Sequence, residues 1–127
     1  MEFKTVAVCA LEGSALDWAV GVAEGNPMAT PASDVVWSEY HGAYNPSTNW
    51  SQGGPLIEKH HVWLSPPSDC VPVGWDADVY SDDGSEGSGV RQVIGCPTAL
   101  IAACRAIVAA KLGKEVSVPA SLLKEPS

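Results

Sequence analysis

A nearly uninterrupted apolar segment at residues 99–112 constrains the fold of this chain more than any other feature. Its large apolar side chains recur at helical intervals, and Pro97, Thr98 and Gly113 stand where a helix begins and ends. Between residues 99 and 110 only Arg105 is charged. A helix that is apolar on all sides has to be buried, so we expect this helix to lie largely inside the protein.

Alternation and helical spacing predict the other elements. Residues 15–24 predict a second helix, which should end at Gly25. Residues 75–80 alternate strictly, and they predict a half-exposed strand that pairs as a hairpin with residues 90–94. Further strands or extended segments are predicted at residues 3–8, 35–37, 56–64 and 115–119. The prediction is therefore an α+β fold in which a small antiparallel sheet packs against two main helices.

Length and charge limit the class of protein. The chain has 127 residues, which suits one domain with a modest core, so we take residues 1–127 as a single domain. Residues 81–89 contain only Ser, Asp, Gly and Glu, a composition that predicts a mobile acidic loop.

The net charge of −8 repels a nucleic-acid backbone at long range, so we expect no duplex nucleic acid as a partner. A small anionic ligand stays compatible with this charge, because a pocket supplies local dipoles of its own.

The apolar segments and the cysteines indicate the compartment. No apolar run approaches the ~20 residues that a membrane helix requires, and the first residues lack the pattern of a signal peptide. We therefore expect a cytoplasmic protein with no membrane partner. The four cysteines show no CxxC spacing, which favours buried free thiols over a zinc site: Cys9, Cys70, Cys96 and Cys104.

Residues 44–55 are the most informative segment for function. The segment carries no charge and little aliphatic surface, but it contains two aromatic rings and several amides and hydroxyls. The rings can stack on a planar group, the polar side chains can contact its edges, and the paired glycines let backbone amides approach a ligand. The predicted ligand-binding residues of this segment are Tyr44, Asn45, Ser47, Thr48, Trp50, Gln52, Gly53 and Gly54. Because the same residue types are ordinary turn formers, two turns with Trp50 in the core between them are the alternative.

Arg105 is the second candidate, since a charge within an apolar helix normally needs a partner. It can pair with Glu58, hold a phosphate of a ligand, or extend its charged end to solvent. The amides around Thr98, at the start of the same helix, are a further candidate for an anionic group. Trp18 lies with Asp17 on the side of the predicted first helix away from its apolar face, where it can extend the aromatic wall or pack in a core or interface. Glu58, Thr98, Arg105 and Trp18 complete the predicted ligand-binding set.

The sequence contains no evident catalytic or metal-binding set. His41, His60 and His61 lack the spacing of metal ligands, and the acidic residues between 76 and 86 do not follow the order of an EF-hand loop. We predict no metal, no cofactor and no enzyme. A small hydrolase that uses Asp17 or Glu58 has little support, because neither carboxylate has an evident base or metal partner.

Residues 15–20, 44–58, 97–105 and 111–113 together resemble the NinX-like phage and prophage proteins. The resemblance implies a phage origin, and hence the cytoplasm of an infected bacterium, but no particular chemistry. In role, a small phage protein with an aromatic, polar pocket and no catalytic set is similar to viral proteins that sequester nucleotide signals of host defence. We therefore expect the chain to sequester a signal of the cyclic-nucleotide or cyclic-ADP-ribose class without catalysis.

The competing prediction is an acidic protein-interaction module that inhibits or redirects a host enzyme through residues 76–86. Uptake of an intact nucleotide distinguishes the two predictions, since an interaction module takes up none. A homo-oligomer is compatible with the sequence, because pockets on small domains are often completed at subunit interfaces.

Overall fold

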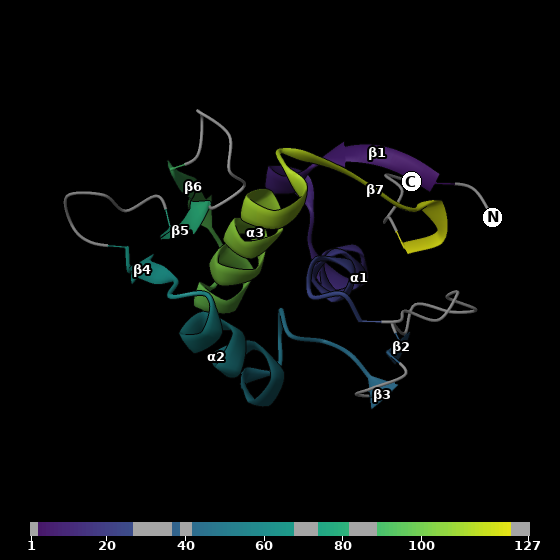
Figure 1. Ribbon diagram of the computed structural model, residues 1–127, viewed down its shortest axis with the longest axis horizontal. Coiled ribbons are helices and arrows are strands. Elements are labelled where there is room, and N and C mark those ends of the chain that lie inside the picture. Colours follow the sequence, from purple (N-terminus) through teal and green to yellow (C-terminus); the bar gives the residue numbers. More distant parts are fainter. Residues whose placement is uncertain (1–2, 27–36, 39–41, 68–73, 82–88, 123–127) are drawn as a thin grey trace.

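The computed structural model describes residues 3–26, 37–38, 42–67, 74–81 and 89–122. Helix α3 (Ala99–Leu112) runs through the middle of the molecule and is buried along most of its length (Figure 1). Its N-cap is Thr98, whose hydroxyl accepts a hydrogen bond from the amide of Ile101 at 3.1 Å, and Gly113 ends it with a φ of 97°. The prediction of a largely buried helix over this segment is confirmed.

A three-stranded antiparallel sheet packs against one side of α3. Its strands are β4 (Trp63–Ser65), β5 (Trp75–Ser81) and β6 (Gly89–Cys96), in the order β4-β5-β6. Strands β5 and β6 form the predicted hairpin, in which Ala77 pairs with Val93. Ala77, Val79 and Val93 are buried, whereas Asp76 and Asp78 are half-buried, so the predicted alternation along β5 is confirmed.

Helix α1 (Gly13–Ala23) and a second antiparallel pair cover the other side of α3 (Figure 1). The pair consists of β1 (Phe3–Ala7) and β7 (Glu115–Pro119), and short 3₁₀ helices follow each of them as η1 (Val8–Ala10) and η2 (Ala120–Leu122). Two short strands, β2 (Trp37–Ser38) and β3 (Gly42–Ala43), also pair. The first two residues of the strand expected at 35–37 lie outside the described part of the chain.

Helix α2 (Trp50–Lys59) takes the first four residues of the strand that we predicted at residues 56–64, and a turn follows it, so that prediction was wrong for all but the last two residues. The helix starts at Asn49, whose side chain accepts from the amide of Ser51 at 3.0 Å. It buries Gly53 and Leu56 and ends at His60, after which His61 adopts a left-handed φ of 52°. Only Trp63–Ser65 then forms the strand β4. The capped start and the buried face decide the helix against the β-rich composition that follows.

The structure also bears on the predictions for Asp17, the cysteines and the acidic loop. Asp17 is 5% exposed, which corrects its predicted place on the outer side of the first helix. Cys96 and Cys104 are buried free thiols as expected, whereas Cys9 is free but exposed, which corrects its predicted burial, and Cys70 lies outside the described residues. Most of the predicted mobile loop, residues 82–88, also lies outside them. The α+β prediction is confirmed, with α2 as an additional helix.

Candidate functional site

The first half of segment 44–55 is a turn that its own polar groups hold closed. The carbonyl oxygen of Asn45 accepts from the amides of Thr48 at 3.1 Å and of Asn49 at 2.9 Å. The amide of Asn45 in turn donates to Oε1 of Gln52 at 2.6 Å. Asn45 and Gln52, which we predicted as ligand contacts, therefore bind each other across the turn that leads into α2.

Gly53 and Gly54 lie inside α2 and have different surroundings. A Cβ on Gly53 would overlap the carbonyl oxygen of Pro46 and would lie only 2.7 Å from Cδ2 of Leu100. A Cβ on Gly54 would meet Cε3 of Trp50 at 3.8 Å, which is an ordinary contact. The close approach that Gly53 permits is therefore made by the turn and by α3.

A cavity of about 240 Å³ lies between the turn and the start of α3, and we call it the Trp50 cavity. Its wall on the side of the turn and α2 consists of Ser47, Thr48 and Trp50. Residues 98–101, at the start of α3, form the other wall. The structure thus brings together four of the predicted ligand-binding residues: Ser47, Thr48, Trp50 and Thr98.

The two walls of the Trp50 cavity offer different chemistry. Trp50 is 59% exposed, so its indole is available to a planar group. The alternative in which Trp50 fills the core between two turns is therefore wrong. On the opposite wall, the amides of Ala99 and Leu100 belong to the first helical turn, where helix geometry supplies no acceptor. These amides and the helix dipole favour an anionic group at this end of α3.

A buried carboxyl supports the turn from below. Oδ1 of Asp17 accepts from the amide of Ser47 at 2.8 Å. Burial raises the pKa of Asp17 from 3.8 to about 6, although the Ser47 amide and hydroxyl act in the opposite direction. The Ser47 hydroxyl is buried and close enough to affect this pKa, but it makes no hydrogen bond of good geometry to any described residue. The Asp17 carboxyl therefore links the turn that precedes α2 to α1.

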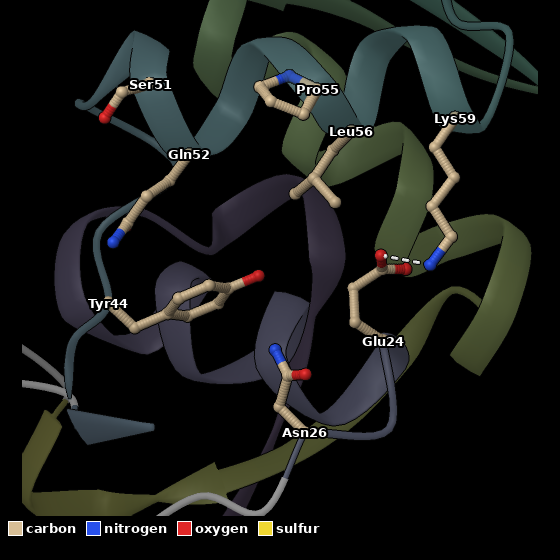
Figure 2. A pocket seen from close by; sticks show the side chains of 8 residues that line it. All are labelled: Glu24, Asn26, Tyr44, Ser51, Gln52, Pro55, Leu56 and Lys59. Carbon is tan, nitrogen blue, oxygen red and sulfur yellow. Dashed lines mark hydrogen bonds and ion pairs between the residues drawn. The ribbon is translucent and has the colours of Figure 1, made fainter. Parts of the chain in front are cut away.

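A second cavity, of about 300 Å³, lies beneath α2, and we call it the Glu24 cavity (Figure 2). Glu24 and Asn26 line it from the end of α1, and Tyr44 lines it from the turn. One face of α2 completes it with Ser51, Gln52, Pro55, Leu56 and Lys59. Two predicted ligand-binding residues, Tyr44 and Gln52, thus face a different cavity from Trp50.

Glu24 is the centre of charge in this second cavity. Its side chain is 7% exposed, and its two oxygens bind Nζ of Lys59 at 2.9 Å and Nε2 of His60 at 2.7 Å. Burial pushes its pKa upward, but the hydrogen bonds and positive charge of Lys59 and His60 outweigh this and hold the pKa of Glu24 below its usual range. Burial and the Glu24 charge in turn raise the pKa of Tyr44 to about 12. Glu24 is therefore ionised, and Tyr44 neutral, at neutral pH.

The remaining predicted residues line neither of these two cavities. Arg105 is 8% exposed, and its Nε donates to the carbonyl oxygen of Leu11 at 2.8 Å while Nη1 lies 3.5 Å from Sγ of Cys96. The alternative that its charged end reaches solvent is thus wrong, and Glu58, its predicted partner, is exposed on α2. Trp18 packs edge-on against Phe3, with ring centroids 5.8 Å apart.

Sequence reasoning missed Glu24, Asn26, Lys59 and His60 as site residues. Glu24 was predicted only as the end of a helix and Asn26 as part of the loop after it, and both lie more than thirty residues before Lys59. The predicted strand at 56–64 also hid the relation between residues 52, 56 and 59, which share one face only in a helix. Recognition of Asn49 as an N-cap with Gln52 three residues later was the signal that could have found this face.

Some site types have no counterpart among the described residues. In that part of the chain, no three or more His, Cys, Asp or Glu side chains are grouped so as to hold a metal ion. The helices described there are also too short or too polar to cross a bilayer. The described residues form a small α+β protein in which the Trp50 cavity and the Glu24 cavity both lie beside α2.

Comparison with known proteins identifies the family. Residues 7–111 match the model of the family described as "Bacteriophage P22, NinX". Because the match covers most of the chain, the chain belongs to this family of phage proteins. No match was found among the curated proteins.

Proposed function

We propose that this phage protein binds a small nucleotide-type signal of host anti-phage defence, of the cyclic-nucleotide or cyclic-ADP-ribose class, and sequesters it without catalysis. The site of action is the cytoplasm of the infected bacterium. The observation that carries the proposal is the exposed indole of Trp50 in the same cavity as the first turn of α3.

A nucleotide combines a flat base with a negative phosphate, and the Trp50 cavity has a partner for each. Stacking of a base on an aromatic side chain is worth about 1–3 kcal/mol. The phosphate fits the amides of Ala99 and Leu100, where the helix dipole adds to the attraction. Thr48 and Thr98 supply hydroxyls at the same cavity. The net charge of −8 acts on the ligand from a distance and is screened beyond about 10 Å at moderate salt.

Sequestration requires tight binding and no reacting group, which agrees with the chemistry at this cavity. Its side chains are hydroxyl, indole and aliphatic groups, none of which titrates near neutral pH. The nearby carboxyl of Asp17 is held by the Ser47 amide. We therefore propose that the ligand is held intact.

The acidic interaction module is the weaker candidate. Asp76 accepts a hydrogen bond from the amide of Gly95 at 3.0 Å, so this carboxylate connects β5 to β6. Asp78 is half-buried on the same strand. These two members of the acidic segment thus have partners or packing within the fold, and no described feature of the segment favours a host enzyme as its partner.

The test is uptake of a ligand that is recovered unchanged. The purified protein is incubated with a panel of cyclic nucleotides and cyclic ADP-ribose isomers, washed, and heat-denatured, and the released compounds are separated by chromatography. Intact ligand that appears only after denaturation is the expected result. Altered ligand would indicate an enzyme, and no uptake of any member of the panel would refute the proposal in favour of the interaction module.

Two tryptophans provide a matched pair of variants for this assay. Trp50→Ala removes the stacking surface and should reduce uptake at least tenfold, since a loss of about 1.4 kcal/mol already has this effect. Trp63→Ala removes an indole that is 76% exposed on β4 and lines neither of the two cavities, so uptake should be unchanged. Equal losses in the two variants would contradict the assignment to the Trp50 cavity.

A further inference from the structure

The Glu24 cavity has no residue in common with the Trp50 cavity, and its chemistry is different. Tyr44, Leu56 and the Glu24 side chain are buried members of its lining, whereas the Lys59 side chain is exposed. Figure 2 shows the side chains of Glu24, Asn26 and Tyr44 converging beneath α2. A ligand in this cavity therefore meets a nearly buried carboxylate.

The two partners of Glu24 differ in how firmly they are held. His60 and Glu24 are both nearly buried, with side chains 8% and 7% exposed. The Lys59 side chain is 62% exposed, and ion pairs with such an exposed partner contribute little to stability, since water and side-chain entropy compete with them. Lys59 can therefore swing into solvent at low cost, but the carboxylate oxygen that it leaves still needs a hydrogen-bond donor.

The rest of the cavity suits a compact polar molecule with a flat or apolar body. Leu56 and Pro55 form an apolar wall. Side-chain amides of Asn26 and Gln52 and the Tyr44 hydroxyl also line the cavity. Amide and hydroxyl groups recognise ligands that carry both donors and acceptors.

We propose that the Glu24 cavity is a second binding site, which takes a ligand whose N–H groups donate to the Glu24 carboxylate in place of the Lys59 ammonium. The ligand class is a small molecule with an amino group, either on a heterocycle such as a nucleobase or on an aliphatic chain. This site does not depend on the function proposed for the Trp50 cavity.

The test uses unphosphorylated probes, so that anion binding at α3 does not contribute. Cytidine and adenosine represent amino-heterocycles, putrescine represents aliphatic amines, and dissociation constants are measured by NMR titration of the whole chain. One of the two arms should saturate with a dissociation constant of about 1 mM or below, equivalent to about 4 kcal/mol. Failure of both arms to saturate in the folded wild type would overturn the proposal.

Lys59→Met is the decisive variant, because it removes the competing ammonium but keeps an unbranched side chain at the rim. It should bind the probe about two- to fivefold more tightly. Lys111→Met makes the same change in net charge on an exposed lysine at the end of α3 and should leave the affinity unchanged. Weaker binding by Lys59→Met would mean that Lys59 itself contacts the ligand, which contradicts the proposal.

A change at the carboxylate itself completes the test. Glu24→Gln should weaken binding at least tenfold, since the charged acceptor is lost. If this variant fails to fold, the sign of the Lys59→Met effect still decides the question. The nucleoside titrations are repeated in Trp50→Ala, in which a base has no indole to stack on in the Trp50 cavity. Saturation that persists in this variant assigns the probe to the Glu24 cavity and separates this site from the proposed function, whereas its loss would contradict the proposal.

Discussion

The two adjacent glycines of α2 offer a sharp test of how this helix packs. Alanine at position 53 adds a Cβ that would overlap the Pro46 carbonyl oxygen and lie 2.7 Å from Cδ2 of Leu100. The carbonyl is part of the backbone and cannot rotate aside, so Gly53→Ala must displace α2, and overpacking of this kind costs about 1–3 kcal/mol. The gain in helix propensity from glycine to alanine, about 0.5–1 kcal/mol, offsets part of this cost. We expect the free energy of unfolding to fall by about 1–2 kcal/mol.

Gly54→Ala is the matched control, since its Cβ meets only Trp50 at 3.8 Å. This variant gains the same helix propensity without the overlap, so its free energy of unfolding should rise by about 0.5–1 kcal/mol. Urea unfolding followed by circular dichroism measures both changes. At about 4 °C per kcal/mol, the Tm values of the two variants should differ by about 6–12 °C. Equal shifts in the same direction would refute the packing of Gly53 against the turn and α3.

Two further changes test the ends and the support of this region. Asn49→Ala removes the N-cap acceptor of α2 and should lower the free energy of unfolding by about 1 kcal/mol. Asn49→Ser keeps an N-cap oxygen and should retain most of the wild-type stability, and urea unfolding of both variants measures the difference. Burial raises the pKa of Asp17 from 3.8 to about 6, so the folded state binds this proton more tightly than the unfolded state does. The free energy of unfolding of the wild type should therefore fall by up to about 3 kcal/mol as the pH rises between these two values. Asp17→Asn keeps an oxygen for the Ser47 amide but cannot ionise, so the wild type should lose stability relative to this variant between about pH 4 and pH 6. A difference between their unfolding curves that does not change with pH would contradict the raised pKa of Asp17.

The elements that the sequence predicts well are those whose pattern and context agree. Helix α3 is apolar on all sides and ends at a glycine, and the β5–β6 hairpin alternates along β5, so local signals and burial point to the same structure. Helix α2 is different, because Gly53, Gly54 and Pro55 are residues that favour turns. Its helical form rests on the Asn49 cap and on the fit of Gly53 against Pro46 and Leu100, which are contacts between separate parts of the chain. Tertiary packing overrides local propensity at such a place.

The sequence likewise predicts one part of the candidate site and misses another. The aromatic composition and the helix start were visible in the sequence, and the structure does place Trp50 and Thr98 at one cavity. The partner of Arg105 was not predictable, because its guanidinium donates to the backbone carbonyl of Leu11, and no sequence pattern indicates which carbonyl a side chain will reach. The pairing of Glu24 with Lys59 likewise depends on how α1 and α2 approach each other.

Binding at the Trp50 cavity is the central claim, and an NMR titration with the ligand retained in the uptake assay tests it most directly. The indole N–H signal of Trp50 is identified by its absence from the spectrum of Trp50→Ala. This signal and the backbone amides of Ala99 and Leu100 should shift together and saturate at one equivalent of ligand, while the indole signal of Trp63 stays in place. Saturable binding that leaves Trp50, Ala99 and Leu100 unshifted would contradict the account.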